Sequence, residues 1–151
     1  MNYRPNEKRF TPKPLNRSYN LCGYEFQLFS LYGYKFDKGL NVPKQKGLYS
    51  FTNFGNRSSV TPFSVCGKVI HAPLYLGETS EKDGLWGRLT SNHDYIKAIH
   101  DGEYERPMVI GIYLAETDED TEDIETEILQ SYYYIRNTQK NYGHFTFIIE
   151  N

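Results

Sequence analysis

Residues 74–94 read LYLGETSEKDGLWGRLTSNHD, and the fold and function of the chain depend on what this stretch does. An apolar, strand-like run ends at Gly77, a turn-forming SEKDG segment follows, and apolar residues then recur at roughly helical spacing. Tyr75, Arg88 and His93 all lie within it. Each could serve packing or solvation alone, but a guanidinium fork beside phenol hydroxyls suits the oxygens of a phosphate. The stretch therefore predicts one half of a phosphate-binding site.

Length and composition indicate one folded domain. The chain has 151 residues, 38% of them hydrophobic, and its 14 tyrosines can supply a core with hydroxyls at its edge. The first residues are too polar for a signal peptide, and no run is long and apolar enough to cross a bilayer. Cys22 and Cys66 stand far apart and match no metal-ligand spacing. We therefore expect a cytoplasmic protein with free thiols and no membrane contact.

Charge is divided unevenly along the chain. Residues 1–93 hold 13 Lys and Arg against 6 Asp and Glu, whereas residues 94–151 hold 4 against 13. A basic half can face a polyanion even though the net charge is −2. The alternative is that both halves are simply solvated surface.

The first 20 residues, MNYRPNEKRFTPKPLNRSYN, combine three prolines with five basic side chains and show no clean periodicity. This composition predicts an extended basic arm over residues 1–20, in front of a single domain over residues 21–151. The arm would hold DNA. Alternatively, it packs on the body as a strap through Tyr3, Phe10 and Leu15.

Hydrophobic periodicity predicts the elements of the domain. The predicted strands cover residues 46–54, 64–78, 106–116 and, at the end, 143–151. The predicted helices cover residues 85–100 and the segment after the acidic run 116–123, which includes Ile124, Ile128 and Leu129. Residues 24–36 fit either a strand or a helical turn. The order predicts an α+β fold with a small central antiparallel sheet of about three strands flanked by helices.

The ordered motifs resemble the GIY-YIG nuclease family over about residues 46–141. They are Gly47-Leu48-Tyr49, Tyr75-Leu76-Gly77, Thr79, Arg88, His93, Glu125 and Asn137. Gly111-Ile112-Tyr113 spells the family name literally, but it follows the arginine and stands at the place of the family's third strand. Each tripeptide alone is weak evidence in a chain so rich in tyrosine, and the order of the set carries the resemblance.

The resemblance implies metal-dependent hydrolysis of phosphodiester bonds in DNA. It implies that Glu125 holds one divalent cation, for which Mg²⁺ or Mn²⁺ suits a carboxylate. Arg88 would neutralise charge on the phosphate. Tyr49 and Tyr75 would position the water or the phosphate, and Tyr49 is the candidate to accept the proton of the water. Asn137 completes the expected set.

Three departures from the family pattern matter. The spacer between Tyr49 and Tyr75 covers 25 residues, 50–74, and the segment SEKDG lengthens the interval to Arg88. Both features resemble the restriction-enzyme branch of the family. His93 follows Arg88 by five positions where the family often has four, which turns it by about 100° more on an ideal helix. Glu127 stays the reserve for the metal-binding role of Glu125.

The expected partner is DNA, double-stranded by preference, and the sequence does not indicate an oligomeric state. The basic residues expected to contact DNA phosphates are Arg4, Lys8, Arg9, Lys13, Arg17, Lys44, Lys46, Arg57 and Lys68. A restriction, phage-borne or mobile-element nuclease is consistent with the size of the chain. Two alternatives stay open: a catalytically inactive relative that binds nucleic acid or protein, and a structural protein whose tyrosines only pack.

Overall fold

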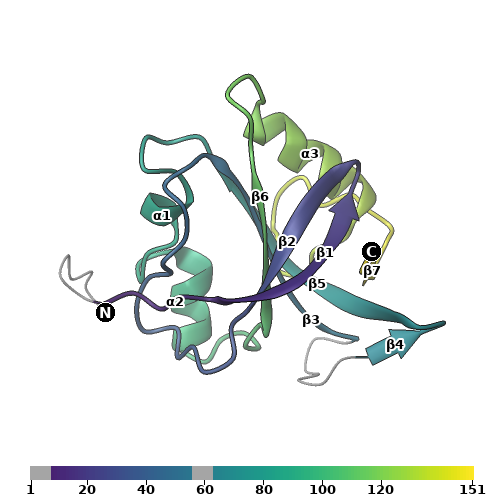
Figure 1. The fold of residues 1–151 in the computed structure, drawn as a ribbon, viewed down its shortest axis with the longest axis horizontal. Coiled ribbons are helices and arrows are strands. Elements are labelled where there is room, and N and C mark those ends of the chain that lie inside the picture. Colours follow the sequence, from purple (N-terminus) through teal and green to yellow (C-terminus); the bar gives the residue numbers. More distant parts are fainter. Residues whose placement is uncertain (1–7, 56–62) are drawn as a thin grey trace.

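Three strands near the predicted positions form the centre of a curled antiparallel sheet (Figure 1). They are β3 (Gly47–Phe54), β5 (Lys68–Thr79) and β6 (Val109–Leu114), and β3 lies between the other two. The structure is a computed structural model, which describes residues 8–55 and 63–151. Every residue of β3 is buried, as expected for a middle strand that is covered on both faces.

The two faces of the central strands contribute to separate apolar clusters. Successive side chains of a strand point to opposite faces. Leu48 therefore packs into a cluster that includes Ile128 of α3 (Thr121–Ser131), whereas Tyr49 packs into a cluster with residues of α1 (Gly84–Arg88) and α2 (Asp94–His100). The sheet thus separates α3 from the α1–α2 pair, and residues of β5 can reach either side.

The sheet is larger than the sequence predicts. Beside the central three, the sheet contains β1 (Lys13–Leu21), β2 (Tyr24–Ser30), β4 (Phe63–Val65) and β7 (Ile148–Ile149). β7 lies within the predicted last strand, 143–151, and β2 within the segment 24–36, for which a strand was one of two alternatives. The strand order is β1-β2-β6-β3-β5-β4, with β7 paired to β5, and all paired strands are antiparallel.

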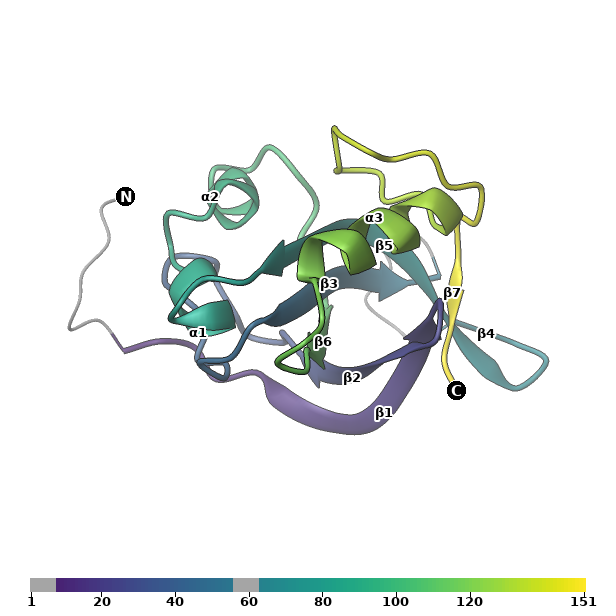
Figure 2. The same ribbon diagram turned by 90° about the horizontal axis from the view of Figure 1, so that it is seen from above.

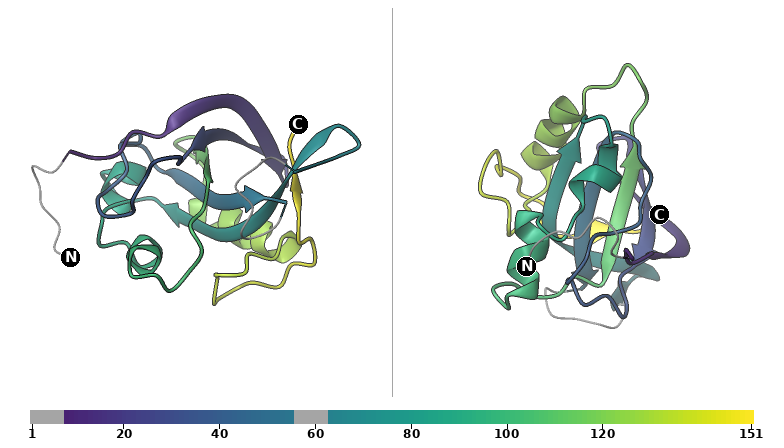
Figure 3. Two further views of the ribbon diagram at one scale, coloured as in Figure 1. Left: turned by 90° about the horizontal axis from the view of Figure 1, so that it is seen from below. Right: turned by 90° about the vertical axis from the view of Figure 1, so that its left-hand side faces the viewer.

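The expected fold class, about three strands flanked by helices, is therefore wrong. The described part of the chain is mostly one sheet, curled into a half-barrel, with three short helices (Figures 2 and 3). No helix in residues 8–55 and 63–151 combines the length and the apolar character needed to cross a bilayer.

Two Cys-Gly dipeptides close hairpins that the sequence interpretation missed. Cys22-Gly23 joins β1 to β2, Cys66-Gly67 joins β4 to β5, and the flanking residues pair directly across each turn. All four turn residues have positive φ, between 52° and 93°. Two consecutive positive φ angles are the mark of a type I′ turn, which usually has Asn, Asp or Gly first and Gly second. Because Cys stands at the first turn position, only the Gly at the second position indicates the turn in the sequence.

Part of the segment expected to form an extended arm lies in the sheet, because residues 13–20 belong to β1. β1 is an edge strand, where Pro14 is tolerated, and its register with β2 shifts between Pro14 and Ser18. Phe10 and Leu15 are partly buried against the two core clusters. Tyr3 lies outside the described residues.

The single helix expected over residues 85–100 is two helices. α1 ends at Arg88, and α2 begins at Asp94 with His93 as its N-cap. Between them, the N–H of Asn92 donates to the side-chain oxygen of Thr90 at 3.3 Å. Such short polar side chains compete for backbone groups and favour turns and caps over helix interiors. The break redirects His93, so the helical angle expected from its spacing does not apply.

A buried polar network ties the end of the described chain to the sheet. His71 on β5 lies with Nδ1 at 2.9 Å from Oγ1 of Thr52 and with Nε2 at 2.6 Å from Oε2 of Glu150. The other carboxylate oxygen of Glu150 pairs with Nε of Arg17 on β1 at 2.9 Å. The network therefore joins β5 to β1 across the curl of the sheet.

Candidate active site

A polar cavity of about 250 Å³ opens beside β5, among α1, α3 and the loop that follows α3. Five of the six predicted site residues line it, namely Tyr49 on β3, Tyr75 on β5, Arg88 on α1, Glu125 on α3 and Asn137 in the loop. The sixth, His93, contacts Tyr49 from the start of α2. Residues from six separate segments thus meet at one place.

Gly77 makes room for Tyr49. The two residues are direct partners across β3 and β5. A Cβ atom on Gly77 would overlap both Cζ and the hydroxyl oxygen of Tyr49. Without that atom, the phenol lies against β5 beside Tyr75, with the two ring centroids 6.3 Å apart. The glycine of the Tyr75-Leu76-Gly77 motif therefore shapes the wall of the cavity.

The hydroxyl oxygen of Tyr49 accepts a hydrogen bond from His93. Nε2 of His93 lies 2.7 Å from it. Nδ1 of His93 already accepts the backbone N–H of Tyr95 at 3.2 Å, so the neutral ring carries its proton on Nε2 and donates it to Tyr49. Arg88 lines the same cavity as Tyr49. Because the oxygen of Tyr49 accepts from His93, its own proton can be donated to another group.

Burial sets the protonation states around Tyr49. Burial, and then the charge of Arg88, lower the pKa of His93 to about 3, so the ring is neutral near pH 7. Burial raises the pKa of Tyr49 above the ordinary phenol value, with Arg88 opposing the rise. Burial also raises the pKa of Tyr75, again against Arg88. The resting site therefore holds a neutral imidazole, two phenols and one guanidinium.

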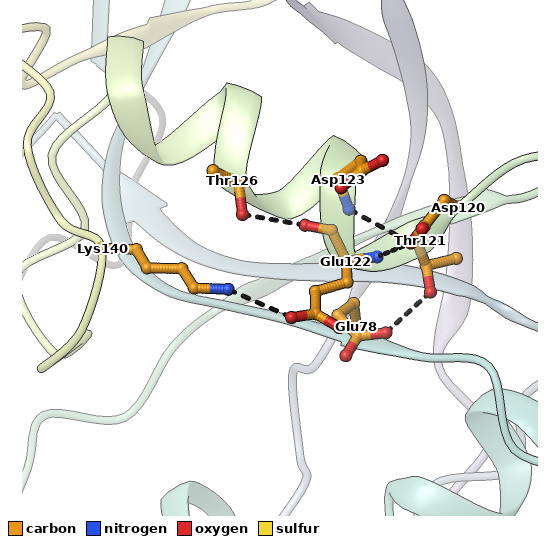
Figure 4. A network of polar contacts seen from close by, with 7 residues as sticks. All are labelled: Glu78, Asp120, Thr121, Glu122, Asp123, Thr126 and Lys140. Atoms are coloured by element: carbon orange, nitrogen blue, oxygen red, sulfur yellow. Dashed lines mark hydrogen bonds and ion pairs between the residues drawn. The ribbon is translucent and has the colours of Figure 1, made fainter.

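Glu125 shares the cavity with a second carboxylate, Glu78, which the sequence interpretation did not select. Oε2 of Glu78 accepts a hydrogen bond from Oγ1 of Thr121 at 2.7 Å (Figure 4). Burial, and then the charge of Glu78, raise the pKa of Glu125 to about 7. The signal for Glu78 was strand alternation: it follows Gly77 and points to the face opposite Tyr49, which is the face that α3 covers.

The acidic run before Glu125 caps its helix. Asp120 is the N-cap of α3, and one of its carboxylate oxygens accepts the backbone N–H groups of Glu122 at 3.0 Å and Asp123 at 3.3 Å (Figure 4). Carboxylates in this position also suit the helix dipole. Lys140, which lines the cavity, reaches back to Glu122 at 3.4 Å in an exposed ion pair. The run is therefore structural, and it fixes the helix turn from which Glu125 projects.

The charges that line the cavity are balanced, with Arg88 and Lys140 against Glu78 and Glu125. A phosphate would enter a site with no net positive charge unless a cation joined it. Among the described residues, no three His, Cys, Asp or Glu side chains are grouped to hold a metal ion. Mg²⁺, however, is commonly held by one or two carboxylates together with water and phosphate, and Glu125 and Glu78 fit that environment. Glu127, the reserve candidate, is exposed and lines a different cavity.

The side-chain amide of Asn137 hydrogen-bonds to the backbone of β5. Its Oδ1 accepts the N–H of Leu76 at 2.9 Å, and its Nδ2 donates to the carbonyl of Leu76 at 2.9 Å. The next residue back, Arg136, donates its N–H to the carbonyl of Leu74 at 2.8 Å. The loop therefore runs along β5 as a neighbouring strand would. Both ends of the Asn137 amide are engaged there, which makes it a residue that positions the wall of the cavity.

Two of the basic residues expected to contact DNA lie beside α1. The guanidinium of Arg9 is 3.5 Å from the centroid of the Trp86 ring, and Nζ of Lys44 is 4.5 Å from it. Trp86 precedes Arg88 by two residues on α1. These cations are therefore close in the chain and in space to the helix that supplies the arginine of the cavity.

The other expected DNA contacts do not gather there. Lys46 donates to two backbone carbonyls at 2.8 and 2.5 Å, and Arg17 pairs with Glu150. The β4–β5 turn that carries Lys68 lies at the end of the sheet away from α1 (Figure 2). Lys8 and Lys13 are exposed. Arg4 and Arg57 lie outside the described residues.

Comparisons of the chain with models of known protein families, with curated proteins and with solved structures found no match.

Proposed function

We propose that the protein is a metal-dependent endonuclease of the GIY-YIG type that hydrolyses phosphodiester bonds in DNA. The observation that carries the proposal is the convergence of Tyr49, Tyr75, Arg88 and Glu125 on one polar cavity. Phosphodiester hydrolysis needs an oriented water, positive charge at the phosphoryl oxygens and help for the leaving oxygen. These four side chains are of the types that meet those needs.

Arg88 would contact the scissile phosphate. It ends α1 at the wall of the cavity, and its guanidinium presents parallel N–H groups that match two phosphoryl oxygens. Its positive charge is also close enough to Tyr49 to oppose the rise that burial causes in the pKa of that phenol. Arg88 therefore links the group that neutralises the phosphate to the group that orients the water.

Tyr49 and Tyr75 would orient the attacking water and one phosphoryl oxygen. The oxygen of Tyr49 accepts from Nε2 of His93, so its own O–H can be donated to a group in the cavity that Tyr49 lines. In the resting site Tyr49 is a phenol, because burial raises its pKa. It becomes able to accept a proton from water only when positive charge gathers beside it, and Arg88 is the contribution of this chain to that charge.

Glu125 would hold the divalent cation, with Glu78 as the second carboxylate on the same cavity. A bound Mg²⁺ or Mn²⁺ supplies charge that stabilises the phosphoryl and leaving oxygens. Burial, and then the charge of Glu78, raise the pKa of Glu125, so a bound cation would favour its ionised form. Lys140 and Arg88 each oppose that rise, and neither forms a close ion pair with Glu125 in the described structure.

The test is incubation of the purified protein with supercoiled plasmid and Mg²⁺, beside samples that contain EDTA and beside Glu125→Gln. Nicked or linear plasmid from the wild type with Mg²⁺ alone is the expected result. The variant keeps the shape of the side chain and loses its charge, so it should bind plasmid and leave it intact. Wild-type protein that shifts plasmid without cutting it would favour the inactive nucleic-acid-binding module. Protein that neither binds nor cuts would overturn the proposal.

A cytoplasmic location belongs to the same proposal. Cys22 and Cys66 are both free thiols, and they occupy equivalent places in two hairpin turns. Free thiols are the usual state in a reducing compartment, where DNA is also present. Fractionation of cells that produce the protein with a small tag would test this part separately.

A further inference from the structure

A second cavity, of about 310 Å³, adjoins the first, and Tyr75 and Thr138 line both. Tyr49, Arg88 and Glu125 line the first cavity and do not line the second. Its walls come from α2, from the segment after α2 and from the loop after α3. A molecule bound at Arg88 could therefore extend past Tyr75 into this second space.

Stacked rings form one wall of the second cavity. The rings of Tyr75 and Tyr95 are 4.7 Å apart and nearly parallel, at 10°. Tyr104 continues the stack at 6.1 Å and 28°, and the guanidinium of Arg136 caps it at 4.3 Å from the Tyr104 centroid. Arg136 is itself held by Glu105 at 2.7 Å. The wall is thus rigid and aromatic, the type of surface on which a flat ring stacks.

The polar groups of this cavity are mainly acceptors. The carboxylates of Asp94 and Glu103 line it, and both residues are exposed. Tyr95 also lines the cavity, but its hydroxyl is shielded from solvent and has no hydrogen-bond partner among the described residues. The cavity therefore offers carboxylate acceptors next to aromatic rings.

These properties select one class of ligand. Two carboxylates repel a phosphate, so the sugar–phosphate backbone does not suit this space. A nucleobase does, because it is flat, stacks on tyrosine, and presents ring or exocyclic N–H groups to acceptors. The neighbouring cavity with Arg88 suits the phosphate of the same nucleotide.

We infer that the cavity lined by Tyr75, Asp94, Tyr95, Glu103 and Tyr104 binds one nucleobase of the substrate, next to the scissile phosphate and taken out of its base pair. The inference rests on the proposed nuclease function. Guanine, adenine and cytosine carry exocyclic amino groups with two N–H donors that carboxylates accept, whereas thymine offers only its ring N3–H. The protein should therefore prefer an amino-bearing base at one position beside the cut.

The first experiment uses duplex oligonucleotides that contain the mapped cleavage site and differ only in the base pair beside it. Wild-type protein should cleave one or more amino-bearing bases about 5- to 150-fold faster than thymine at that position. Asp94→Asn should lose most of this preference. Asp101→Asn makes the same charge change on the exposed C-cap of α2, outside the cavity, and should keep it. Equal cleavage of all four bases by the wild type, or an unchanged preference in Asp94→Asn, would overturn the inference.

The second experiment detects the base directly. 2-Aminopurine replaces each base around the cut in turn, and Ca²⁺ replaces Mg²⁺ so that DNA binds uncut. The fluorescence should change on binding at one position beside the cut and stay near its duplex value farther away. Tyr104→Ala, which shortens the stack, should alter that response. DNA that is bound and cut with no fluorescence change at any position would refute the base site and leave the nuclease proposal standing. Absence of both binding and cleavage would instead refute the nuclease proposal.

Discussion

Nε2 of His93 donates a 2.7 Å hydrogen bond to the hydroxyl oxygen of Tyr49, while Nδ1 of the same ring caps α2 by accepting the N–H of Tyr95. One imidazole thus connects the start of a helix to the centre of the cavity. Both bonds depend on the break between α1 and α2, since a continuous helix would leave no N-cap there. The local fold of residues 89–93 therefore decides how Tyr49 is held.

His93→Asn should separate these two tasks. Asparagine is among the best N-cap residues, so α2 keeps an acceptor for its first turn. The shorter side chain does not reach Tyr49, so the hydroxyl oxygen loses the donor that His93 provides. We expect plasmid cleavage to fall by about 100-fold, the cost of losing the position of a reacting group, while DNA affinity is retained. A variant with a wild-type rate and an unchanged melting temperature would show that the Tyr49 contact is dispensable.

Gly77→Ala should displace Tyr49, because the added Cβ overlaps the phenol. We expect a loss of about 1–3 kcal/mol in the free energy of unfolding, the usual cost of overpacking, together with a large loss of cleavage. The double variant with Tyr49→Ala is the control. Once the ring is absent, the Gly77→Ala change should cost much less, and urea unfolding of the four proteins in the cycle measures the difference. If Gly77→Ala lowers the free energy of unfolding equally with and without the Tyr49 ring, the added Cβ clashes with another group.

Glu125 should make the stability of the metal-free protein depend on pH. Its pKa is raised from 4.5 to about 7 in the folded protein, so the folded state binds more protons than the unfolded chain between those values. The free energy of unfolding should therefore fall as the pH rises through this window. In EDTA, Glu125→Gln should lack this component and exceed the wild type in stability at pH 8.

The exposed neighbour Glu127 provides the control for that comparison. Glu127→Gln should follow the wild-type curve, because its side chain lies outside the cavity. Mg²⁺ should raise the melting temperature of the wild type and of Glu127→Gln, and should have little effect on Glu125→Gln. A rise of equal size in all three proteins would place the cation at another site.

Arg88→Lys should behave almost like Arg88→Ala in cleavage. An ammonium keeps the charge but cannot bridge two phosphoryl oxygens. Loss of an arginine that stabilises a phosphoryl transition state costs about 1000-fold or more, and lysine should recover at most about 10-fold of that. Single-turnover cleavage with saturating DNA is the measurement. Near wild-type turnover in the lysine variant would reduce the role of Arg88 to general charge.

Substitution of Arg17 and of Lys44 should distinguish a basic residue that stabilises the fold from one that contacts DNA. Arg17 pairs with the largely buried Glu150, so Arg17→Ala should lower the melting temperature and leave the salt dependence of DNA binding unchanged. Lys44 lies beside α1, and Lys44→Ala should lower the log–log salt slope by roughly 0.9 if it contacts one phosphate of duplex DNA. The reverse pattern would move the DNA-binding surface to the β1 end of the sheet.

The central strands could be predicted because their own residues and the turn residues beside them both favour strands. Val109 to Leu114 and Gly47 to Phe54 are short apolar or aromatic runs bounded by turn residues. Tyr49, Tyr75, Arg88 and Glu125 could be named from motif order, and the structure brings them to one cavity. Local sequence patterns therefore identified the central strands and the site residues that these elements carry.

The missing parts depend on contacts between distant segments. Strand alternation places Glu78 on the face of β5 opposite Gly77, but Glu78 joins the site only because the distant helix α3 covers that face. β1 carries Pro14 and a shifted register, so it shows no strand period, and it becomes a strand by pairing with β2. The ideal helical angle turned His93 away from the position usual in the family, but the Thr90–Asn92 turn interrupts the helix and His93 contacts Tyr49.

The bond between Asn151 and Ser18 spans 133 positions, and Glu150 beside it is the partner of both Arg17 and the buried His71. A ribosome delivers β1 long before residues 150 and 151. Until those residues emerge, the imidazole of His71 lacks its carboxylate, and the contact that Glu150 makes between β5 and β1 is absent. A nascent chain released before residue 150 would therefore carry a defect in its interior, far from the codon at which translation stopped, and cellular proteases should remove it faster than a chain that contains Glu150.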